Sequence, residues 1–226
     1  MRTITSNAIE ECLEMIYRLE ENEGVAKTSK LVRVLGVAKG TVTNAVERLE
    51  KLSLITHNPY KGVRLTPKGR AIALRIIRRH RLSECLLTEI LKMDWEVAHE
   101  SACLLEHSVT DEIADKIEEV LLHPRTCPHG NPIPKSDGSL DIDASKPLVE
   151  LTSRRRCVVT KIVDEDPNLL QHLKTLNIRP GTHIEILERH PVGGLIRIRL
   201  RGVEHQLSHE IASIIRVRDV DEQVLA

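Results

Sequence analysis

Residues 28–51 read TSKLVRVLGVAKGTVTNAVERLEK, and this stretch decides the fold of the first third of the chain. Its first eight residues have the pattern of a short helix, for which Thr28 and Ser29 offer N-caps and Gly36 a C-terminal stop. After a tight turn, a second short helix is predicted from about Thr41. Two short helices joined in this way are typical of a helix-turn-helix, whose second helix enters the major groove of DNA.

The flanking segments extend this pattern to a winged helix. Residues 5–22 carry an apolar helical stripe, and two β-prone runs, 54–56 and 63–66, surround a turn rich in polar residues. A hairpin at that place is a wing. Nine residues from the second helix, its approach and the wing are expected to face DNA phosphates and base edges. They are Lys27, Ala38, Lys39, Thr41, Thr43, Asn44, Arg48, Tyr60 and Lys61.

Charge is unevenly distributed, although the formal net charge is zero. Residues 1–81 hold 16 Lys and Arg against 8 Asp and Glu, whereas residues 82–150 hold 5 against 15. A basic first third favours a polyanionic partner such as double-stranded DNA. Two alternatives stay open at this point: a randomly charged solvated surface, and a winged helix that binds protein.

Composition excludes several classes of protein. No run approaches the roughly 18 apolar residues of a membrane span, and the N-terminus has no apolar signal region. The five cysteines are odd in number and scattered, which favours reduced thiols. We therefore expect a cytoplasmic protein with no membrane partner. There is no Phe, so its cores must be aliphatic.

Potential metal ligands gather within residues 80–107. They are His80, Glu84, His99, Cys103, Glu106 and His107. Long helices are predicted at 71–91 and 95–122, and on them the first two ligands share one face and the other four share one stripe. Imidazole, thiolate and carboxylate together suit a first-row transition metal and do not suit Ca²⁺ or Mg²⁺. Each residue alone has an ordinary explanation, but buried together they need a cation to neutralise them.

Two further features of the sequence bear on this cluster: a pair of carboxylates on the first helix, and an excess of apolar residues on the two long helices. Glu11 and Glu14 lie three residues apart on the first helix, on a face outside its apolar stripe, and are predicted to supply carboxylates to the metal. The two long helices carry more apolar residues than one helix pair must bury. That excess predicts a homodimer, which would space two recognition helices for a palindromic operator.

The chain is expected to comprise a DNA-binding domain (1–70), a helical domain for dimerisation and metal binding (71–140), a proline-containing linker (141–150) and a β-rich domain (151–226). In the last of these, β-prone runs occur at 157–159, 182–187, 195–200 and 203–207, with a short helix at 167–176.

Several strings resemble the metal-dependent repressors of the diphtheria toxin repressor and manganese transport regulator family. They are EECLEMIY (10–17), LTPKG (65–69), RHRLSECLL (79–87), HESACLLEH (99–107) and CPHGNPIP (127–134). The resemblance covers residues 1–140 well and the remainder loosely. It implies a mainly α fold with a small β domain: a winged helix-turn-helix, a helical dimerisation domain and an SH3-like (FeoA-like) C-terminal barrel.

The resemblance also assigns roles. It places Cys103, Glu106 and His107 in a regulatory metal site, and places His80, Glu84 and His99 in an ancillary one. In iron-type members the barrel lends a Glu and a Gln to the ancillary site. The aligned positions here hold Asp166 and Leu169, so only Asp166, or its neighbour Glu165, can serve.

The implied metal depends on two departures from the family pattern. Glu11 and Glu14 resemble the carboxylates of manganese-type members, whereas Cys103 and a third domain follow the iron type. The resemblance favours Fe²⁺ as corepressor, with Mn²⁺, Co²⁺, Zn²⁺ or Ni²⁺ as alternatives, and genes of metal uptake as targets. There is no nucleophile motif and no Gly-rich phosphate loop, so we expect neither an enzyme nor a small-molecule substrate. A metal-dependent hydrolase and a regulator with structural Zn²⁺ are the competing hypotheses.

Overall fold

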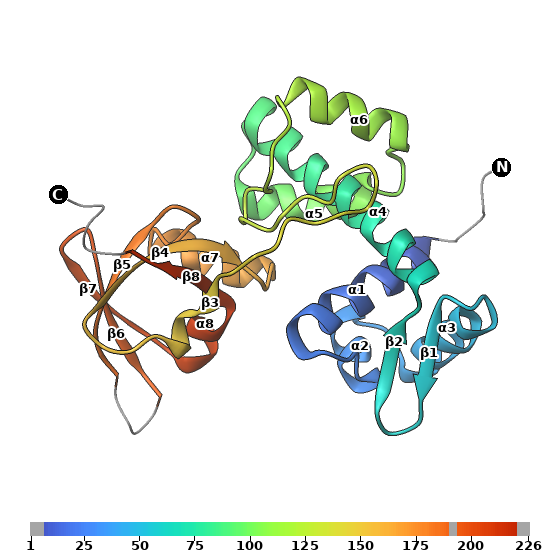
Figure 1. Ribbon diagram of the computed structural model, residues 1–226, viewed down its shortest axis with the longest axis horizontal. Coiled ribbons are helices and arrows are strands. Elements are labelled where there is room, and N and C mark those ends of the chain that lie inside the picture. The colour runs from blue at the N-terminus through green and yellow to red at the C-terminus, as the bar shows by residue number, and fades with distance from the viewer. Residues whose placement is uncertain (1–6, 190–193, 221–226) are drawn as a thin grey trace. The chain divides into compact units, whose positions relative to one another are not determined.

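The computed structural model describes residues 7–189 and 194–220 (Figure 1). These residues form two compact units. The first consists of residues 7–83, 103–120 and 134–140, and the second of residues 84–102, 121–133 and the described residues from 141 onward. Within the described residues, no helix is long and apolar enough to cross a membrane.

The first unit begins with the predicted winged helix-turn-helix. Its elements are α1 (Asn7–Glu23), α2 (Thr28–Leu35), α3 (Lys39–Lys51), β1 (Ile55–Asn58) and β2 (Gly62–Leu65). Gly36 ends α2 in the left-handed conformation, with a φ of +63°. The predicted N-caps are wrong, because Lys27 occupies the cap position of α2 and no side chain caps the helix. Tertiary packing therefore holds this short helix at its start.

The core of the winged helix is aliphatic, as expected. Leu13, Leu31 and Val46, from the three helices in turn, are among its buried residues, each less than 4 % exposed. Full burial of such a side chain is worth about 1.5–3 kcal/mol. Tyr17 is the aromatic exception, and its hydroxyl donates to a carboxylate oxygen of Glu21 at 2.7 Å. These contacts fix α1 against the two helices that follow.

The wing is a two-stranded antiparallel hairpin that contacts α3 through β1 (Figure 1). Gly62 is required there for two reasons. Its φ is +116°, and a Cβ at this position would lie 2.7 Å from the carbonyl oxygen of Ala26. Ala26 in turn pairs with Val63 through two backbone hydrogen bonds. Tyr60 stands at the hairpin tip, fully exposed to solvent.

The helical middle differs from the prediction at one place. Its elements are α4 (Pro67–Cys85), the π-helical turn η1 (Leu86–Ile90), α5 (Trp95–Leu105) and α6 (Asp111–Val120). A continuous helix over 95–122 is therefore wrong. Two amides, those of Ser108 and Val109, donate to the carbonyl of Leu105, and the hydroxyl of Thr110 accepts from the amide of Ile113 to start α6. The turn places Glu106 beyond the end of α5.

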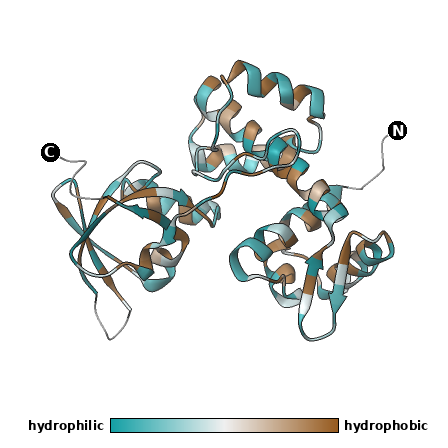
Figure 2. Cartoon of the chain, in the orientation of Figure 1, coloured by the Kyte–Doolittle hydropathy of each residue, from teal (hydrophilic) through white to brown (hydrophobic). Residues whose placement is uncertain are grey.

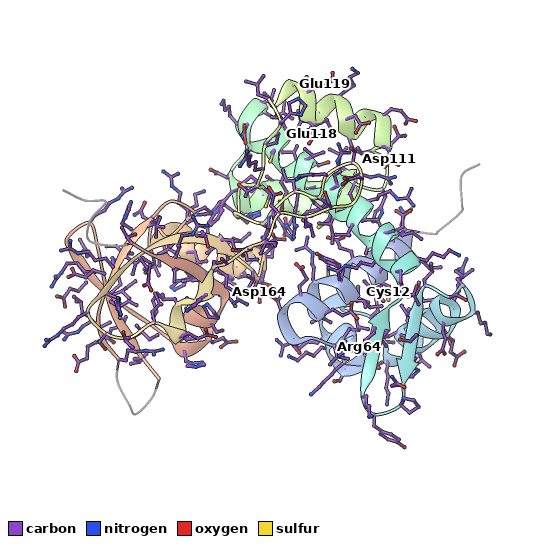
Figure 3. The ribbon with its side chains drawn as sticks, in the orientation of Figure 1. Cys12, Arg64, Asp111, Glu118, Glu119 and Asp164 are labelled. Carbon is purple, nitrogen blue, oxygen red and sulfur yellow. The ribbon has the colours of Figure 1, made fainter. Side chains whose placement is uncertain are left out.

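Within the first unit, ion pairs hold α6 to α4. Arg78, whose side chain is 5 % exposed, donates to Asp115 at 2.8 Å and to Glu118 at 2.7 Å. Arg79 donates to Asp111 at 2.8 Å. Figure 3 labels Asp111 and Glu118 on α6. Two arginines of the basic run on α4 thus take part in packing α6 against α4.

The second unit is built around one antiparallel sheet. Its elements are β3 (Lys146–Pro147), η2 (Leu148–Glu150), β4 (Arg155–Ile162), α7 (Pro167–Thr175), β5 (His183–Arg189), β6 (Ile196–Leu200), β7 (Val203–Leu207), α8 (His209–Ile214) and β8 (Ile215–Asp219). The strand order is β3-β8-β4-β5-β6-β7. Apolar and charged residues alternate along β6 and β8, and Figure 2 shows both brown and teal in this sheet. The edge strands β3 and β7 do not pair in the described part of the chain, so the sheet is open and not the closed barrel that was expected.

Candidate metal centres and DNA-binding surface

A buried cluster in the first unit joins α1, α4 and the turn after α5. Glu14 is 3 % exposed, His80 0 % and Glu106 2 %, and each offers a ligand atom within 4.8 Å of the others. His80 Nδ1 lies 2.6 Å from Glu106 Oε2. His80, predicted for the ancillary site, thus lies beside the regulatory ligands. Two carboxylates and an imidazole at this distance are a ligand set for a first-row divalent metal.

Electrostatics distinguish the two carboxylates of this cluster. Burial raises the pKa of Glu106 to about 8, against an opposing effect of His80, and the neighbouring charge of Glu14 adds to the rise. Burial also works to raise the pKa of Glu14, but the charge of Arg18, with smaller effects of His80 and Glu106, outweighs it and the net pKa is lowered. Arg18 donates to Glu14 Oε1 at 2.7 Å. The raised pKa of Glu106 favours its protonated form, and Arg18 is a cation beside Glu14; a metal dication would supply positive charge at the same place.

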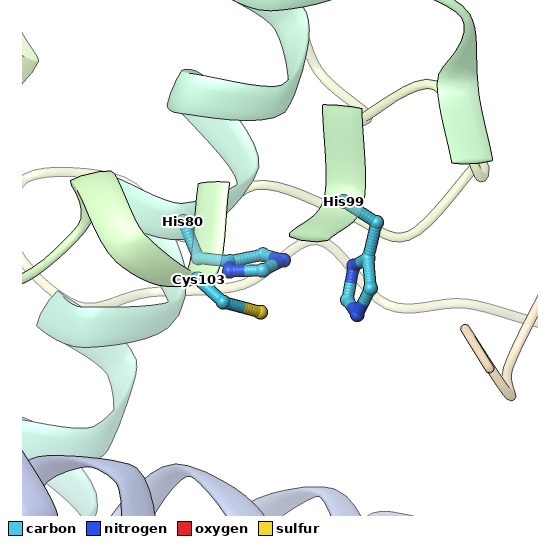
Figure 4. Close-up of side chains that lie close together, drawn as sticks. All are labelled: His80, His99 and Cys103. Carbon is cyan, nitrogen blue, oxygen red and sulfur yellow. The ribbon is translucent and has the colours of Figure 1, made fainter. Parts of the chain in front are cut away.

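Other predicted ligands border this cluster. Cys103, exposed on α5, offers its sulfur within 4.8 Å of a ring nitrogen of His80 (Figure 4). His107 Nδ1 lies 3.0 Å from Glu10 Oε2. Glu11 is exposed and belongs to none of the metal-ligand groups of the described residues. The first helix thus brings Glu10 and Glu14, which are four residues apart and share a helical face, to this region, whereas Glu11 is exposed to solvent.

A second cluster lies entirely within the second unit. It consists of Glu84, Cys127, His129 and Glu165, all buried, with one ligand atom of each within 4.8 Å of the others. His129 Nδ1 lies 3.2 Å from Glu84 Oε1 and 3.6 Å from Glu165 Oε1. His99 borders the cluster, with its Nδ1 2.9 Å from Glu84 Oε1. Thiolate, imidazole and carboxylate donors without a buried basic side chain among them fit a transition metal.

Neighbouring backbone and side chains hold this second cluster in place. The Asn131 amide donates to Glu165 Oε1 at 2.7 Å and to the Ile162 carbonyl at 2.9 Å. Gly130 has a φ of +83°, and a Cβ there would lie 2.0 Å from the Thr160 carbonyl oxygen. Only glycine lets the loop approach β4 this closely. The close approach places His129 in the cluster and Asn131 in contact with Glu165.

The residues gathered in the second cluster differ from the predicted ligand set at three positions. Asp166 is the N-cap of α7 and accepts from the amides of Asn168 and Leu169, so its side chain is already engaged, and Glu165 enters the cluster in its place. Cys127 and His129 were not predicted as ligands. Their signal was the Cys-x-His spacing inside the proline-rich string 127–134, which was used only for the family resemblance.

The predicted DNA-binding surface is exposed throughout. All nine residues, Lys27, Ala38, Lys39, Thr41, Thr43, Asn44, Arg48, Tyr60 and Lys61, are solvent-exposed. The inward face of α3 is formed by buried residues such as Val42 and Leu49. Its outward face therefore presents hydroxyl, amide and cationic groups to solvent, which suits contacts with phosphates and base edges.

Fold and site together define a winged-helix regulator with clustered metal ligands. The chain matches three family models: "Iron dependent repressor, N-terminal DNA binding domain" over residues 4–63, "Iron dependent repressor, metal binding and dimerisation domain" over 66–135, and "FeoA domain" over 146–219. It belongs to the family of metal-dependent transcriptional repressors that includes the diphtheria toxin repressor.

Relatives match over nearly the whole chain. The diphtheria toxin repressor of Corynebacterium efficiens is 32% identical, covering 92% of this chain and 94% of its own length. The iron-dependent repressor IdeR of Mycobacterium leprae is 34% identical, covering 92% and 95%.

Solved structures agree with these relatives. A manganese-dependent transcriptional repressor in complex with manganese has a TM-score of 0.88 at 29% identity, covering 94% of this chain and 100% of its own. The IdeR of T. acidophilum has a TM-score of 0.82 at 30% identity, covering 98% and 100%.

Proposed function

We propose that this chain is an Fe²⁺-dependent repressor of metal-uptake genes that binds a palindromic operator as a homodimer, in the cytoplasm and without catalysis. Fe²⁺ acts as corepressor. The domain boundaries 1–70, 71–140 and 151–226 belong to the same proposal. One observation carries it: Glu14, a residue of the DNA-binding domain, lies in one buried cluster with His80 and Glu106 of the helical domain.

The cluster explains how metal would act on DNA binding. Glu14 lies on the same helix as Leu13 and Ile16, which pack in the core of the winged helix. Holding Glu14 to His80 and Glu106 therefore holds α1, and with it the helix-turn-helix, against α4. A metal with higher affinity for this arrangement shifts the population toward the DNA-competent state.

The choice of Fe²⁺ rests on the donor atoms. We assign Glu14, Cys103, Glu106 and His107, with His80, to the sensing site; Cys103 supplies a thiolate, which favours a softer metal than an all-carboxylate site does. We assign Glu84, Cys127, His129 and Glu165, with His99, to the second site. An Mn²⁺-responsive repressor is the second candidate, favoured by the carboxylates of the sensing site. Glu11, being exposed, has no metal role in this proposal.

Exposed apolar side chains support the homodimer. Leu104 is 82% exposed, Val120 64% and Leu122 86%. These side chains lie on α5, at the end of α6 and in the turn after it, and exposed apolar side chains of this size are costly to leave in water, which supports an interface. With a second copy of the chain as partner, two α3 helices could occupy successive major grooves, as a palindromic site requires.

The experiment is operator binding measured by fluorescence anisotropy under anaerobic conditions. The duplex is selected from a random pool for binding in the presence of Fe²⁺, and Fe²⁺, Mn²⁺, Co²⁺, Ni²⁺ and Zn²⁺ are then titrated in parallel. Glu106→Gln is expected to weaken metal-dependent binding at least about tenfold. Glu100→Gln, an exposed position on α5, is the matched control and should behave as the native chain.

Outcomes separate the candidates. If chelation leaves operator affinity unchanged, the corepressor mechanism is wrong, and metal that also resists removal points to structural Zn²⁺. If operator binding is half-maximal at a lower concentration of Mn²⁺ than of Fe²⁺, the manganese alternative is favoured. In that case Cys103→Glu should leave the order of the metals unchanged, whereas in an iron sensor it should shift the preference toward Mn²⁺.

A further inference from the structure

The second unit contains a cleft of about 400 Å³ outside both metal-ligand clusters. Its walls come from the segment between η1 and α5, from Pro128, from the turn that follows α7, and from the β6–β7 hairpin. This volume lies within the range of small-molecule sites and is too small for a nucleic-acid strand.

One wall of the cleft is cationic. Arg179 and Arg201 both line it, and neither makes an ion pair with any residue that the structure describes. The lining also contains one carboxylate, that of Asp94. Lys174, the third cation of the lining, differs from them, because it binds Asp94 at 3.1 Å and Glu96 at 2.5 Å. Two guanidinium groups are therefore available to a ligand, and guanidinium binds carboxylate and phosphate with two parallel hydrogen bonds.

Both arginines stand on tight turns. Arg201 adopts a φ of +47° in the two-residue turn between β6 and β7, where Gly202 follows with a φ of +86°. The backbone amide of Arg179 donates to the Thr182 hydroxyl at 3.1 Å, and that hydroxyl donates to the Asn177 carbonyl at 3.2 Å. The backbone that carries the guanidinium groups is thus preorganised, which lowers the entropic cost of binding.

Part of the lining of the cleft is apolar. Trp95 lines the cleft together with Met93 and Ile178, and it packs against the core of the C-terminal sheet. Its ring also lies 5.1 Å from the ring of His129, at an angle of 30°. An aromatic ring held on one side by a core and by a second ring, and lining a cleft, suits stacking with a planar ligand.

We propose that this cleft binds a small organic anion: a carboxylate or phosphate held by Arg179 and Arg201, on a planar apolar body that packs on Trp95. The proposal does not depend on which metal the chain senses. Carboxylate and phosphate ligands share this chemistry, and the probes below distinguish them.

The test follows the indole N–H resonance of Trp95 in the full-length chain. Trp95 is the sole tryptophan, so this signal is assigned without ambiguity. The probes are phenyl phosphate and benzoate, with neutral benzamide and inorganic phosphate as their counterparts, each also titrated by calorimetry. Phenyl phosphate or benzoate should shift the indole signal saturably, and the stronger of the two identifies the anionic group. Benzamide should bind at least about tenfold more weakly than benzoate.

Substitution of the two cleft arginines tests whether they hold the anion. R179Q/R201Q should weaken binding of the anionic probe at least about tenfold while leaving thermal unfolding unchanged, because both side chains are exposed. Arg199→Gln is the matched control, since its guanidinium is already paired with Glu185 and Glu204. The proposal is overturned if no anion shifts the indole signal, if the double variant binds as the native chain does, or if inorganic phosphate binds as tightly as phenyl phosphate.

Discussion

Replacing Arg18 by methionine tests the electrostatic logic of the sensing site. In the metal-free protein Arg18 is the cation that compensates Glu14, which is buried beside Glu106. Methionine keeps much of the apolar stem and removes the charge. Removing one partner of a buried ion pair costs about 3–5 kcal/mol. The side chain of Arg18 is 17% exposed and that of Glu14 is 4% exposed, so solvent reduces this to about 2–3 kcal/mol.

R18M should lose less folding stability when metal is bound than when it is absent. A dication at the cluster supplies the positive charge that Arg18 provides without it, so we expect a loss of only about 1 kcal/mol. The difference, about 1.4 kcal/mol, corresponds to metal binding that is about tenfold tighter in R18M than in the native chain. The arginine thus acts as an internal competitor of the metal.

The assay is urea unfolding with and without saturating Mn²⁺, together with calorimetric titration of Mn²⁺. Arg75→Met is the matched control, because Arg75 lies on α4 and only approaches Asp111, at 3.9 Å between exposed side chains. It should change stability by less than about 0.5 kcal/mol in either state. Equal losses with and without metal in R18M, or weaker metal binding, would refute the reasoning.

Three further predictions concern protons and the second cluster. The pKa of Glu106 is raised from its ordinary 4.5 to about 8, so its contribution to metal-free stability is present at acidic pH and lost as pH rises toward 8. Metal displaces that proton, so the apparent metal affinity should rise with pH up to about 8, with proton release measurable by calorimetry in buffers of different ionisation enthalpy. Gly130→Ala should cost about 3 kcal/mol in urea unfolding, because its Cβ meets a backbone oxygen, whereas Gly138→Ala, with the same φ of +83° and open space, should cost about 1 kcal/mol. Glu165→Gln should lower the number of metal ions bound per chain, measured after equilibrium dialysis, and Asp166→Asn, which keeps the helix cap, should not.

The winged helix could be predicted from sequence because its signals are local. Gly36 marks the tight turn, and the periodicity of Val42 and Leu49 identifies the inner face of α3, so neither depends on distant contacts. The end of α5 could not be predicted in this way. Glu106 and His107 continue the helical spacing of ligand types, and only the capping hydroxyl of Thr110 shows that a new helix starts.

Half of the second cluster was missed for a different reason: Glu84 and, as an alternative to Asp166, Glu165 were predicted, but Cys127 and His129 were not. Glu84 is a helix residue, Cys127 and His129 lie in a loop, and Glu165 precedes α7, so no spacing in the chain relates them. The strand β8 was also missed, although its sequence IRVRD alternates apolar and charged residues as a half-buried strand does. Five residues are too few to establish a period-two pattern, and a segment with two arginines resembles an exposed surface loop.

The two clusters differ in what a metal would hold together. Glu14 belongs to a helix of the DNA-binding domain, so metal at the first cluster acts on the orientation of α1 and hence on the winged helix. Glu84, His129 and Glu165 belong to the second unit alone, and metal there joins a helix, a loop and the start of α7 within it. The first cluster has a proton and an arginine that metal must displace, which makes its occupancy respond to metal concentration and pH. The second combines a thiol and two carboxylates with a buried imidazole, and we expect it to fill at lower metal concentration and to stabilise the second unit. We therefore expect the first cluster, with its built-in competitor, to be the sensor and the second to be a structural site.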